Sequence, residues 1–307
     1  MIFDTHAHYD DEQFNEDREI VLKNLKDQNI IAVNVGASFE GSCKALEYAN
    51  KYDFIYGAVG IHPDNVGELD NEKFEKLTQM ARNNQIVAIG EIGLDYHWMV
   101  EEKELQKYWF IKQLELARTL AKPINVHSRD AAMDTLSIIK EHGQNLGGII
   151  HCYSYSVEQA IEYLEMGYYI GIGGVVTFKN SKKLKEVVKQ IPIDRIVLET
   201  DCPYLAPEPN RGKRNSSLNL KYVAAAIGEI KELSEEQVID ITFENAKRVY
   251  KLDIGAILIL LPMTTSRVVF SICGLVVLLI GIVMLVDRIR KRRLLEPKDD
   301  PNIIDAL

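Results

Sequence analysis

The sequence is poor in cysteine, with four among 307 residues, and no two of them form a CxxC pair. A disulfide framework and a zinc site built of thiolates are therefore not expected. The N-terminal segment Met1–Phe14 is acidic and lacks the basic and apolar regions of a secretory signal. These absences predict that the N-terminal part of the chain lies in the cytoplasm.

Positive charge is also scarce, since 36 Lys and Arg against 45 Asp and Glu give a formal net charge of −9. A protein surface that coats nucleic acid is usually basic, so a broad duplex-binding face is not expected. A small contact at the end of a strand, screened by bound divalent cations, is compatible with this charge. The hydrophobic content of 47% is that of a globular chain.

Short apolar runs alternate with longer polar segments along the first 200 residues. The predicted strands are Met1–Asp4, Ile30–Gly36, Ile55–Gly60, Ile86–Gly90, Pro123–Val126, Gly148–Ile150, Tyr168–Gly171 and Ile196–Leu198. Segments between them, such as Glu101–Ala121 and Ala131–Glu141, favour helices. Eight strands that alternate with helices indicate a parallel sheet, which can close into a barrel of about 250 residues. The sequence thus predicts an α/β fold, a TIM-type (β/α)8 barrel over residues 1–252.

The composition changes sharply near Asp253. From Ile254 to Val286 the only charged residue is Arg267, and Val268–Val286 is a run of 19 uncharged residues. A run of that length spans the hydrocarbon core of a bilayer. We therefore expect a C-terminal extension, 253–307, with a transmembrane helix at 268–286 and a basic tail, which anchors the catalytic domain to a membrane.

The topology of this extension stays open. The basic cluster at 288–293 favours a cytoplasmic C-terminus, but a single pass cannot keep both this cluster and the N-terminal domain in the cytoplasm. A helical hairpin with Ile254–Leu261 as its first leg is one alternative. The segment Leu261–Thr265, followed by an apolar run and a basic tail, also resembles a sortase sorting signal. A fused reading frame is the remaining alternative.

Side chains that can bind metal ions lie where the predicted strands end. The first strand leads into His6 and His8, and alternate residues of a strand share a face, so both imidazoles can point into the barrel mouth. The later strand ends carry Glu91, His127, His151 and Asp201. Active sites of such barrels lie at the C-terminal ends of the strands. We therefore predict that these six side chains bind metal.

The types of ligand indicate the chemistry. Nitrogen and oxygen ligands without thiolate suit Zn²⁺, Mn²⁺ or Mg²⁺. Glu91 can bridge two cations about 3.5–4 Å apart, the spacing used for in-line phosphoryl displacement. Asp201 can bind a cation and also accept the proton of an attacking water as general base. The pattern predicts two divalent metal ions, with Glu91 and Asp201 as catalytic residues.

Contact with a substrate phosphate is predicted for five further residues. They are His62, Arg129, Arg211, Lys213 and Arg214. The first two follow predicted strands, whereas the other three lie in the loop after the eighth strand, where these barrels often hold phosphate. Trp98 and Trp109 are interpreted as residues of helix packing rather than of base stacking.

Seven short motifs occur in order along residues 1–252. They are His6-Ala7-His8, Gly60-Ile61-His62-Pro63, Gly90-Glu91-Ile92-Gly93-Leu94-Asp95, His127-Ser128-Arg129, His151-Cys152-Tyr153-Ser154, Glu199-Thr200-Asp201-Cys202-Pro203-Tyr204-Leu205 and Arg211-Gly212-Lys213-Arg214-Asn215. As a set they resemble the TatD family of metal-dependent deoxyribonucleases, in the amidohydrolase superfamily. The resemblance implies a TIM-type barrel, DNase activity, often as a 3′-to-5′ exonuclease, and the six metal ligands named above. Tyr155 and Ser216-Ser217 depart from the family pattern, which leaves the substrate preference open.

Three functions follow from these features. The leading one is a metal-dependent phosphodiesterase that acts on DNA ends. The second keeps the metals but cleaves an ester or amide, such as an aminoacyl-tRNA linkage, because the same activated water can attack a carbonyl group. The third is a catalytically silent, membrane-tethered binding module, against which the complete ligand set argues. The partners expected are thus DNA ends or another small phosphodiester and a membrane, and no protein partner is implied.

Overall fold

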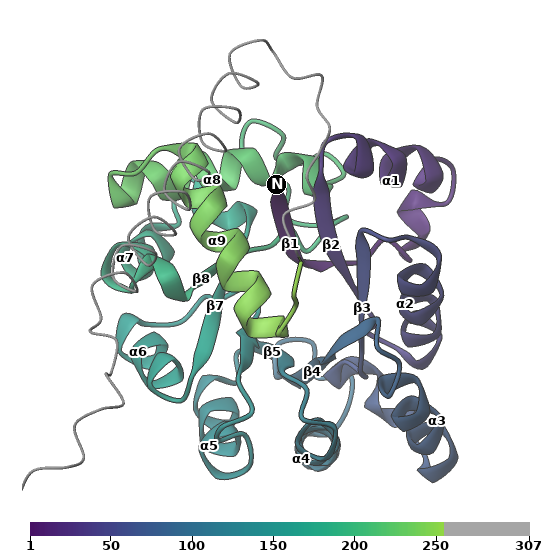
Figure 1. Cartoon of the computed structure of the whole chain (residues 1–307). Helices are drawn as coiled ribbons and strands as arrows, with labels where there is room; N and C mark the ends of the chain where they lie inside the picture. Colours follow the sequence, from purple (N-terminus) through teal and green to yellow (C-terminus); the bar gives the residue numbers. More distant parts are fainter. Residues whose placement is uncertain (255–307) are drawn as a thin grey trace, which may run out of the picture. The chain divides into compact units, whose positions relative to one another are not determined.

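A computed structural model describes residues 1–254, in which eight parallel strands form one sheet with helices around it (Figure 1). The order of the strands in the sheet follows the chain. The strands are β1 (Ile2–Ala7), β2 (Ile30–Val35), β3 (Ile55–Val59), β4 (Ile86–Asp95), β5 (Ile124–Arg129), β6 (Gly148–Ile150), β7 (Tyr168–Ile172) and β8 (Ile196–Leu198). The predicted TIM-type barrel is confirmed.

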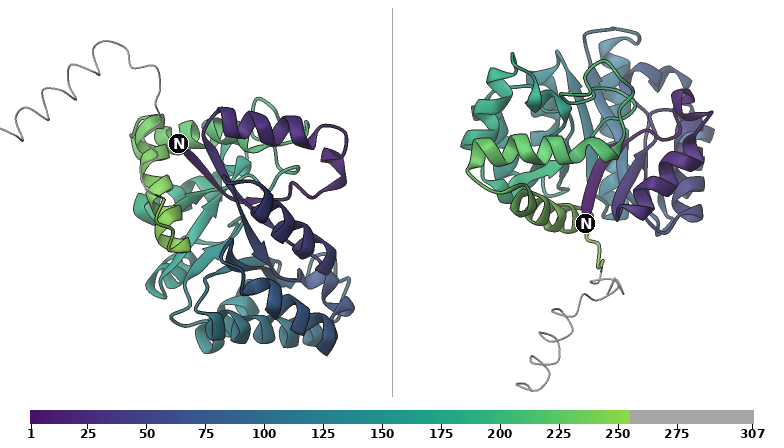
Figure 2. Two further views of the ribbon diagram at one scale, coloured as in Figure 1. Left: turned by 45° about the vertical axis from the view of Figure 1, so that its right-hand side comes forward. Right: turned by 90° about the horizontal axis from the view of Figure 1, so that it is seen from above.

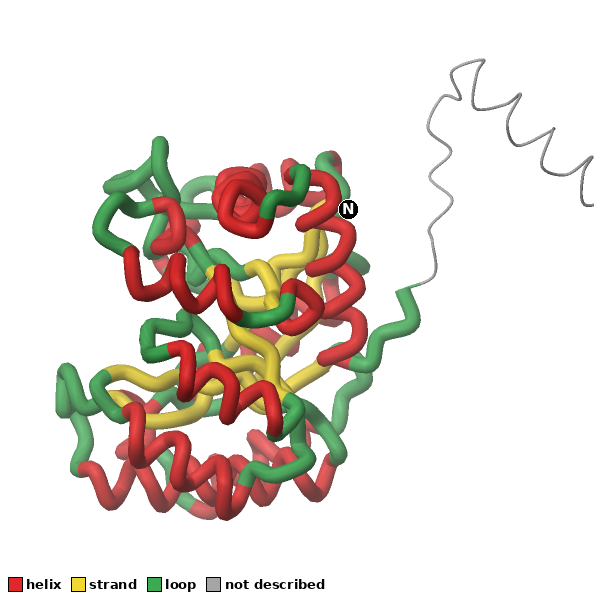
Figure 3. Tube along the Cα trace, turned by 90° about the vertical axis from the view of Figure 1, so that its left-hand side faces the viewer, coloured by secondary structure: helices red, strands yellow, loops and turns green. Residues whose placement is uncertain are grey.

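The helices lie outside the strands, as the further views in Figures 2 and 3 show. The α-helices are α1 (Arg18–Asp27), α2 (Phe39–Lys51), α3 (Asn71–Ala81), α4 (Lys103–Leu120), α5 (Ala132–His142), α6 (Val157–Glu165), α7 (Lys182–Gln190), α8 (Leu220–Lys231) and α9 (Glu235–Tyr250). Short 3-10 helices are η1 (Glu12–Phe14), η2 (Pro63–Glu68), η3 (Gly174–Thr177), η4 (Ile193–Arg195) and η5 (Ser217–Asn219). Residues Met1–Asp253 form one compact unit.

Side-chain caps set where several helices begin. Ser38, Asp70 and Ser156 each accept a hydrogen bond from the backbone N–H three residues later. At α9, Ser234 and Gln237 form a reciprocal capping box. Such caps satisfy N–H groups that have no partner within the helix, so they define the helix starts that the polar segments only suggested.

Three strands continue three or more residues beyond their predicted ends. β1 reaches Ala7, β4 reaches Asp95 and β5 reaches Arg129. The predicted strands stop earlier because polar residues interrupt the apolar runs there, while the strands themselves continue. For β4 and β5 the paired residues run on to Asp95 and Arg129. The predicted metal ligands His6, Glu91 and His127 therefore lie within strands, which restrict where their side chains can point.

The two tryptophans have different environments. Trp109 in α4 is buried and packs beside Phe74, so its predicted role in helix packing is confirmed. Trp98 precedes α4 and is 62% exposed, so the same prediction for Trp98 is wrong. The reason is that α4 begins only at Lys103. The segment before it belongs to the loop that follows β4.

The first and last strands meet without a regular ladder of hydrogen bonds. An isolated bridge joins Ala7 to Cys202, and the N–H of His8 donates to the carbonyl of Cys202 at 2.8 Å. The hydroxyl of Thr5 donates to the carbonyl of Leu198 at 3.0 Å. β8 has only three residues and forms no regular ladder with β1. Side-chain hydrogen bonds and single backbone hydrogen bonds close the barrel there instead.

A buried network around Asp4 strengthens this closure. The carboxylate of Asp4 accepts hydrogen bonds from the backbone N–H of Thr200 at 3.0 Å and from the hydroxyls of Thr200 and Ser217, each at 2.6 Å. Burial raises the pKa of Asp4 to about 7, although these hydrogen bonds lower it. Asp4 is fully buried, so loss of a donor leaves a carboxylate oxygen that water cannot solvate.

Helix α9 packs against β1 and β8 where β1 begins. The rings of Phe243 and Tyr250 lie 6.1 and 5.9 Å from that of Phe3. The hydroxyl of Tyr250 donates to the carbonyl of Thr5 at 2.9 Å. Helix α9 therefore packs along the first part of β1, from Phe3 to Thr5, before the strand reaches His6.

The predicted transmembrane helix at 268–286 and its basic tail lie outside the described residues. Within residues 1–254, no helix is both long and apolar enough to cross a bilayer. The membrane anchor therefore stays a prediction.

Replacement of Ser217 by Ala should destabilise the barrel, because it removes a donor to Asp4 and a partner of the Tyr9 hydroxyl. We expect the free energy of unfolding to fall by about 1–3 kcal/mol in urea titrations. Ser216→Ala is the matched control, since Ser216 is only half-buried and its side chain makes no hydrogen bond within the described residues. Equal stabilities of the two variants would show that the Asp4 network does not hold the closure together.

Candidate metal centre

The six predicted metal ligands converge at the C-terminal ends of the strands. They are His6 in β1, His8 just after β1, Glu91 in β4, His127 in β5, His151 directly after β6 and Asp201 after β8. His6, Glu91 and His151 are buried, and the other three are half-buried. Five strands that are separate in sequence thus supply one cluster, as the barrel topology requires.

Glu91 lies between two pairs of histidines. Its Oε1 is 2.9 Å from Nδ1 of His127 and 3.9 Å from Nε2 of His151. Its Oε2 is 3.5 Å from Nε2 of His6 and 3.7 Å from Nε2 of His8. Each carboxylate oxygen therefore faces a different pair of imidazoles, which is the arrangement that a carboxylate shared by two cations needs.

Asp201 completes the cluster. Its Oδ1 lies 3.3 Å from Nε2 of His8 and 3.7 Å from Nε2 of His151. The same oxygen is 4.0 Å from Nε2 of His6. Its backbone N–H donates to the carbonyl of His6 at 2.9 Å, so the closure between β1 and β8 also fixes this carboxylate against the histidines of β1.

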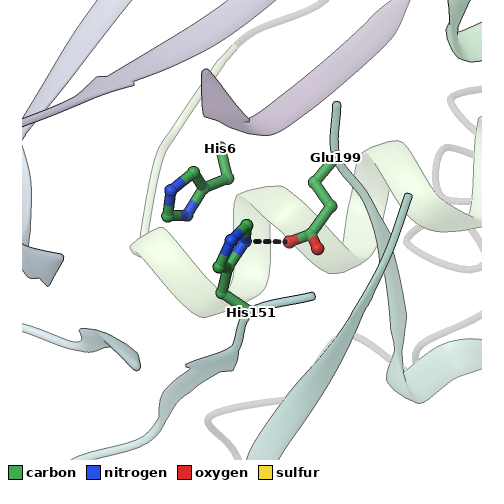
Figure 4. Close-up of side chains that lie close together, drawn as sticks. All are labelled: His6, His151 and Glu199. Carbon is green, nitrogen blue, oxygen red and sulfur yellow. Dashed lines mark ion pairs between the residues drawn. The ribbon is translucent and has the colours of Figure 1, made fainter. Parts of the chain in front are cut away.

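The imidazoles are crowded in a way that suits a cation. Nε2 of His6 lies 3.1 Å from Nε2 of His8, and the rings of His6 and His151 stack at 3.5 Å between centroids (Figure 4). Two neutral ring nitrogens at that distance repel one another unless a proton or a cation lies between them. The ligand atoms of His6, His8 and Asp201 all lie within 4.8 Å of one another. The residues present therefore fit a divalent cation.

The carboxylates of this cluster favour positive charge on the groups around them. Burial lowers the pKa of His8, but the hydrogen bond and charge of Asp201 outweigh it and raise the pKa to about 10. His127 behaves alike: burial lowers its pKa, while Asp95 and Glu91 raise it to about 9. Burial raises the pKa of Glu91, but the neighbouring histidines hold it well below its usual range. When no metal ion is bound, the negative charge of the ionised carboxylates thus keeps these histidines protonated.

Two further carboxylates orient the ligands, and the sequence analysis did not assign them. Oδ2 of Asp95 lies 3.1 Å from Nε2 of His127, on the side of the ring away from Glu91. Oε2 of Glu199 lies 3.1 Å from Nδ1 of His151 (Figure 4). Carboxylates in such positions fix the tautomer and the orientation of a ligand histidine. The sequence held a signal for both residues, because side chains an even number of positions apart in an extended segment share a face. Asp95 lies four residues after Glu91, and Glu199 lies two residues before Asp201.

Glu199 also binds the backbone beside His151. Its Oε1 accepts the N–H of Cys152 at 2.6 Å, and its side chain is almost fully buried. Oε2 of Glu199 and Nδ1 of His151 are close but not aligned as a hydrogen bond, and among the described residues neither has another partner. Glu199 therefore holds both the ring and the main chain of this ligand segment.

A cavity of about 880 Å³ opens over the cluster. Five of the six ligands line it, all except His6, together with His62 and Arg129. Arg129 is the only Lys or Arg in its wall within residues 1–254. Of the five residues predicted to contact phosphate, the structure thus brings these two, His62 and Arg129, to the cavity.

The three predicted basic residues in the loop after β8 lie outside the cavity wall. Arg214 makes two hydrogen bonds with Asp17, at 2.6 and 2.8 Å, and Arg211 stacks on the ring of Phe178 at 4.2 Å. Neither these two nor Lys213 lines the cavity. The loop's place after a barrel strand was visible in the sequence, whereas the contact of Arg214 with Asp17, just before α1, was not. Phosphate contact at the three residues stays a prediction.

The chain matches known proteins over the barrel. Residues 3–251 match the family model described as TatD related DNase. The chain belongs to the TatD family. It is 45% identical to the metal-dependent hydrolase YabD of Bacillus subtilis, over 82% of this chain and all of that protein. It is 34% identical to the metal-dependent hydrolase YcfH of Escherichia coli, over 82% of this chain and 97% of that protein.

Solved structures agree with this assignment. The crystal structure of the TatD homolog YjjV of Escherichia coli superimposes with a TM-score of 0.76 at 27% identity, over 82% of this chain and 98% of that one. A TatD family hydrolase of Entamoeba histolytica gives a TM-score of 0.73 at 26% identity, over 81% of this chain and 97% of that one. This TatD protein is therefore a metal-dependent hydrolase, as the sequence predicted.

Glu199→Gln should weaken metal binding without unfolding the barrel. The amide keeps the shape of the side chain but loses the charge that orients His151. We expect Zn²⁺ affinity to fall by about 10- to 100-fold, measured by competition with a chelator. Glu229→Gln, an exposed position on α8, is the control. Unchanged affinity in Glu199→Gln would reduce Glu199 to a backbone contact.

Metal affinity should also keep rising with pH above the range in which free histidine titrates. In the metal-free chain the pKa values of His8, His127 and His151 are about 10, about 9 and about 9, so cations displace protons from these rings. Lower pH therefore weakens binding. Zn²⁺ affinity should increase from about pH 6 to about pH 9, with proton release seen by calorimetry in two buffers. A plateau that begins near pH 7 would contradict these pKa values.

Proposed function

We propose that this TatD protein hydrolyses phosphodiester bonds at the ends of DNA strands with two divalent cations. The observation that carries the proposal is the position of Glu91, with one oxygen toward His6 and His8 and the other toward His127 and His151. The family description as a DNase supports the choice of substrate.

The donor set divides between two cations. His6, His8 and Asp201 would hold one, and His127 and His151 the other, with Glu91 shared. When bound, such a pair activates water and neutralises the charge that develops on the phosphorus oxygens. Asp201 is accessible from the cavity, and burial raises its pKa less than the hydrogen bond of His8 and the nearby imidazoles lower it. It is therefore ionised and can accept a proton from the attacking water.

His62 is suited to bind a phosphate oxygen as a neutral donor. Its Nδ1 accepts the backbone N–H of Asp64 at 3.1 Å, which places the ring proton on Nε2. Burial and the charge of His127 lower the pKa of His62 to about 3, so it stays neutral near pH 7. Arg129 at the cavity wall supplies a positive charge to the same substrate group.

The acidic cavity explains why cations are needed. Asp10, Asp11 and Asp64 line it in addition to the carboxylates of the metal cluster. A phosphodiester would be repelled by these groups unless cations compensated for them. The cavity and the overall negative charge favour a short strand end over a long duplex.

Hydrolysis of a carboxylic ester, such as an aminoacyl-tRNA linkage, is the second candidate. This candidate is supported by the positions of Arg211, Lys213 and Arg214, which do not line the cavity. Arg129 is then the one Lys or Arg in the cavity wall among the described residues. Both reactions use the same ligand set, so only the substrate separates them.

Digestion of end-labelled DNA by the full chain tests the proposal. We expect single- and double-stranded oligonucleotides to shorten only with added Mn²⁺, Mg²⁺ or Zn²⁺, and Glu91→Gln to lose both bound metal and this activity. Glu165→Gln, exposed on α6, is the control for a change of charge. A metal-loaded protein that leaves every DNA intact but hydrolyses an aminoacyl ester would support the second candidate instead.

A further inference from the structure

Trp98 exposes a large aromatic surface at the mouth of the metal cavity. It is 62% exposed, it lines the cavity, and the next two residues, Met99 and Val100, are exposed as well. Single exposed apolar residues are common, but an apolar segment at the rim of a polar cavity marks a place where a ligand binds. The polar metal cluster thus has an aromatic wall beside it.

The backbone of this segment is fixed to the metal cluster. Oδ1 of Asp95 accepts the N–H groups of His97 at 2.8 Å and Trp98 at 3.0 Å, while its other oxygen contacts His127. The side chain of Gln106 donates to the carbonyls of Asp95 and Glu101. Asp95 therefore sets the position of Trp98 relative to the ligand His127. The indole is held in place although its surface is open.

Arg129 lies over the indole. Its guanidinium carbon is 5.3 Å from the centroid of the Trp98 ring, a cation–π distance. His97 meets the indole edge-on at 4.8 Å and contacts Asp130 at 3.0 Å. These neighbours cover only part of the ring, which stays 62% exposed. A flat aromatic group can therefore stack on Trp98 beside Arg129, the one Lys or Arg in the described wall of the cavity.

A second aromatic residue lines the same cavity after β8. Tyr204 is 50% exposed, and its hydroxyl donates to Asp11 at 2.7 Å. It follows Asp201 by three residues, so it too is attached directly to a metal-ligand segment. The cavity wall thus combines two exposed aromatic rings with an acidic, metal-binding floor.

We propose that Trp98 and Arg129 form a nucleotide subsite, in which Trp98 stacks on a nucleobase and Arg129 binds the phosphate attached to that nucleotide. This inference rests on the proposed function and adds how the strand end is recognised. Base stacking on an aromatic side chain tolerates any sequence, because every base has a flat face. Bases in a duplex already stack on their neighbours, so the subsite favours a strand end whose last nucleotides are unpaired.

Kinetics with Trp98→Ala test the subsite. On oligonucleotides with unpaired ends we expect KM to rise by about 5- to 150-fold, the effect of losing one stacked base, with little change in kcat. Trp98→Phe should recover most of the loss. A substrate whose terminal nucleotides are abasic should show no such difference between wild type and Trp98→Ala. Tyr108→Ala, 51% exposed on α4 and away from the cavity, is the control.

Fluorescence gives a readout that does not need catalysis. The chain has two tryptophans, and Trp109 is buried, so a nucleobase that stacks on the protein surface should quench Trp98. Titration of the Mg²⁺-loaded protein with a short single-stranded phosphorothioate oligonucleotide, which resists hydrolysis, should quench the wild type, and an abasic strand of the same chemistry should not. If the protein cuts no DNA but is quenched in this way, the proposed function fails and the subsite stands. Cleavage with equal KM in wild type and Trp98→Ala, or equal quenching by the abasic strand, would overturn the subsite.

Discussion

The carboxylate of Glu91 is 4% exposed and has histidine nitrogens on both sides. Burial of a charged group costs free energy that only nearby opposite charge or hydrogen bonds can offset. Protons on His8 and His127 supply part of that charge in the metal-free chain, and divalent cations would supply it more completely. Metal binding and folding are therefore coupled through this one group.

The contacts that close the barrel between β1 and β8 also position part of the metal cluster. β1 and β8 meet at a few hydrogen bonds, and those bonds include the one from Asp201 to His6 and the one from His8 to Cys202. The Asp4 network lies just below them. The contacts that close the sheet thus also hold His6, His8 and Asp201 next to one another. A change that loosens the junction should disturb the metal site before it disturbs the rest of the barrel.

Much of this could be predicted from periodicity. Eight apolar runs that alternate with helices gave the barrel, and ligand-type residues at strand ends gave the candidate centre, because parallel strands end on one rim. The orienting carboxylates Asp95 and Glu199 were missed, since an acidic residue at a strand end does not reveal which ring it faces. The contact of Arg214 with Asp17 joins residues far apart in the chain, and Trp98 lies in a loop without periodicity. Such placements depend on tertiary contacts.

Anomalous X-ray scattering from crystals of the manganese-loaded full chain would locate the cations directly. We expect two peaks about 3.5–4 Å apart, with one oxygen of Glu91 bound to each ion, His6 and His8 on one and His127 and His151 on the other. Two ions bound away from Glu91, or a single ion held without it, would contradict the assignment of Glu91 as the shared ligand.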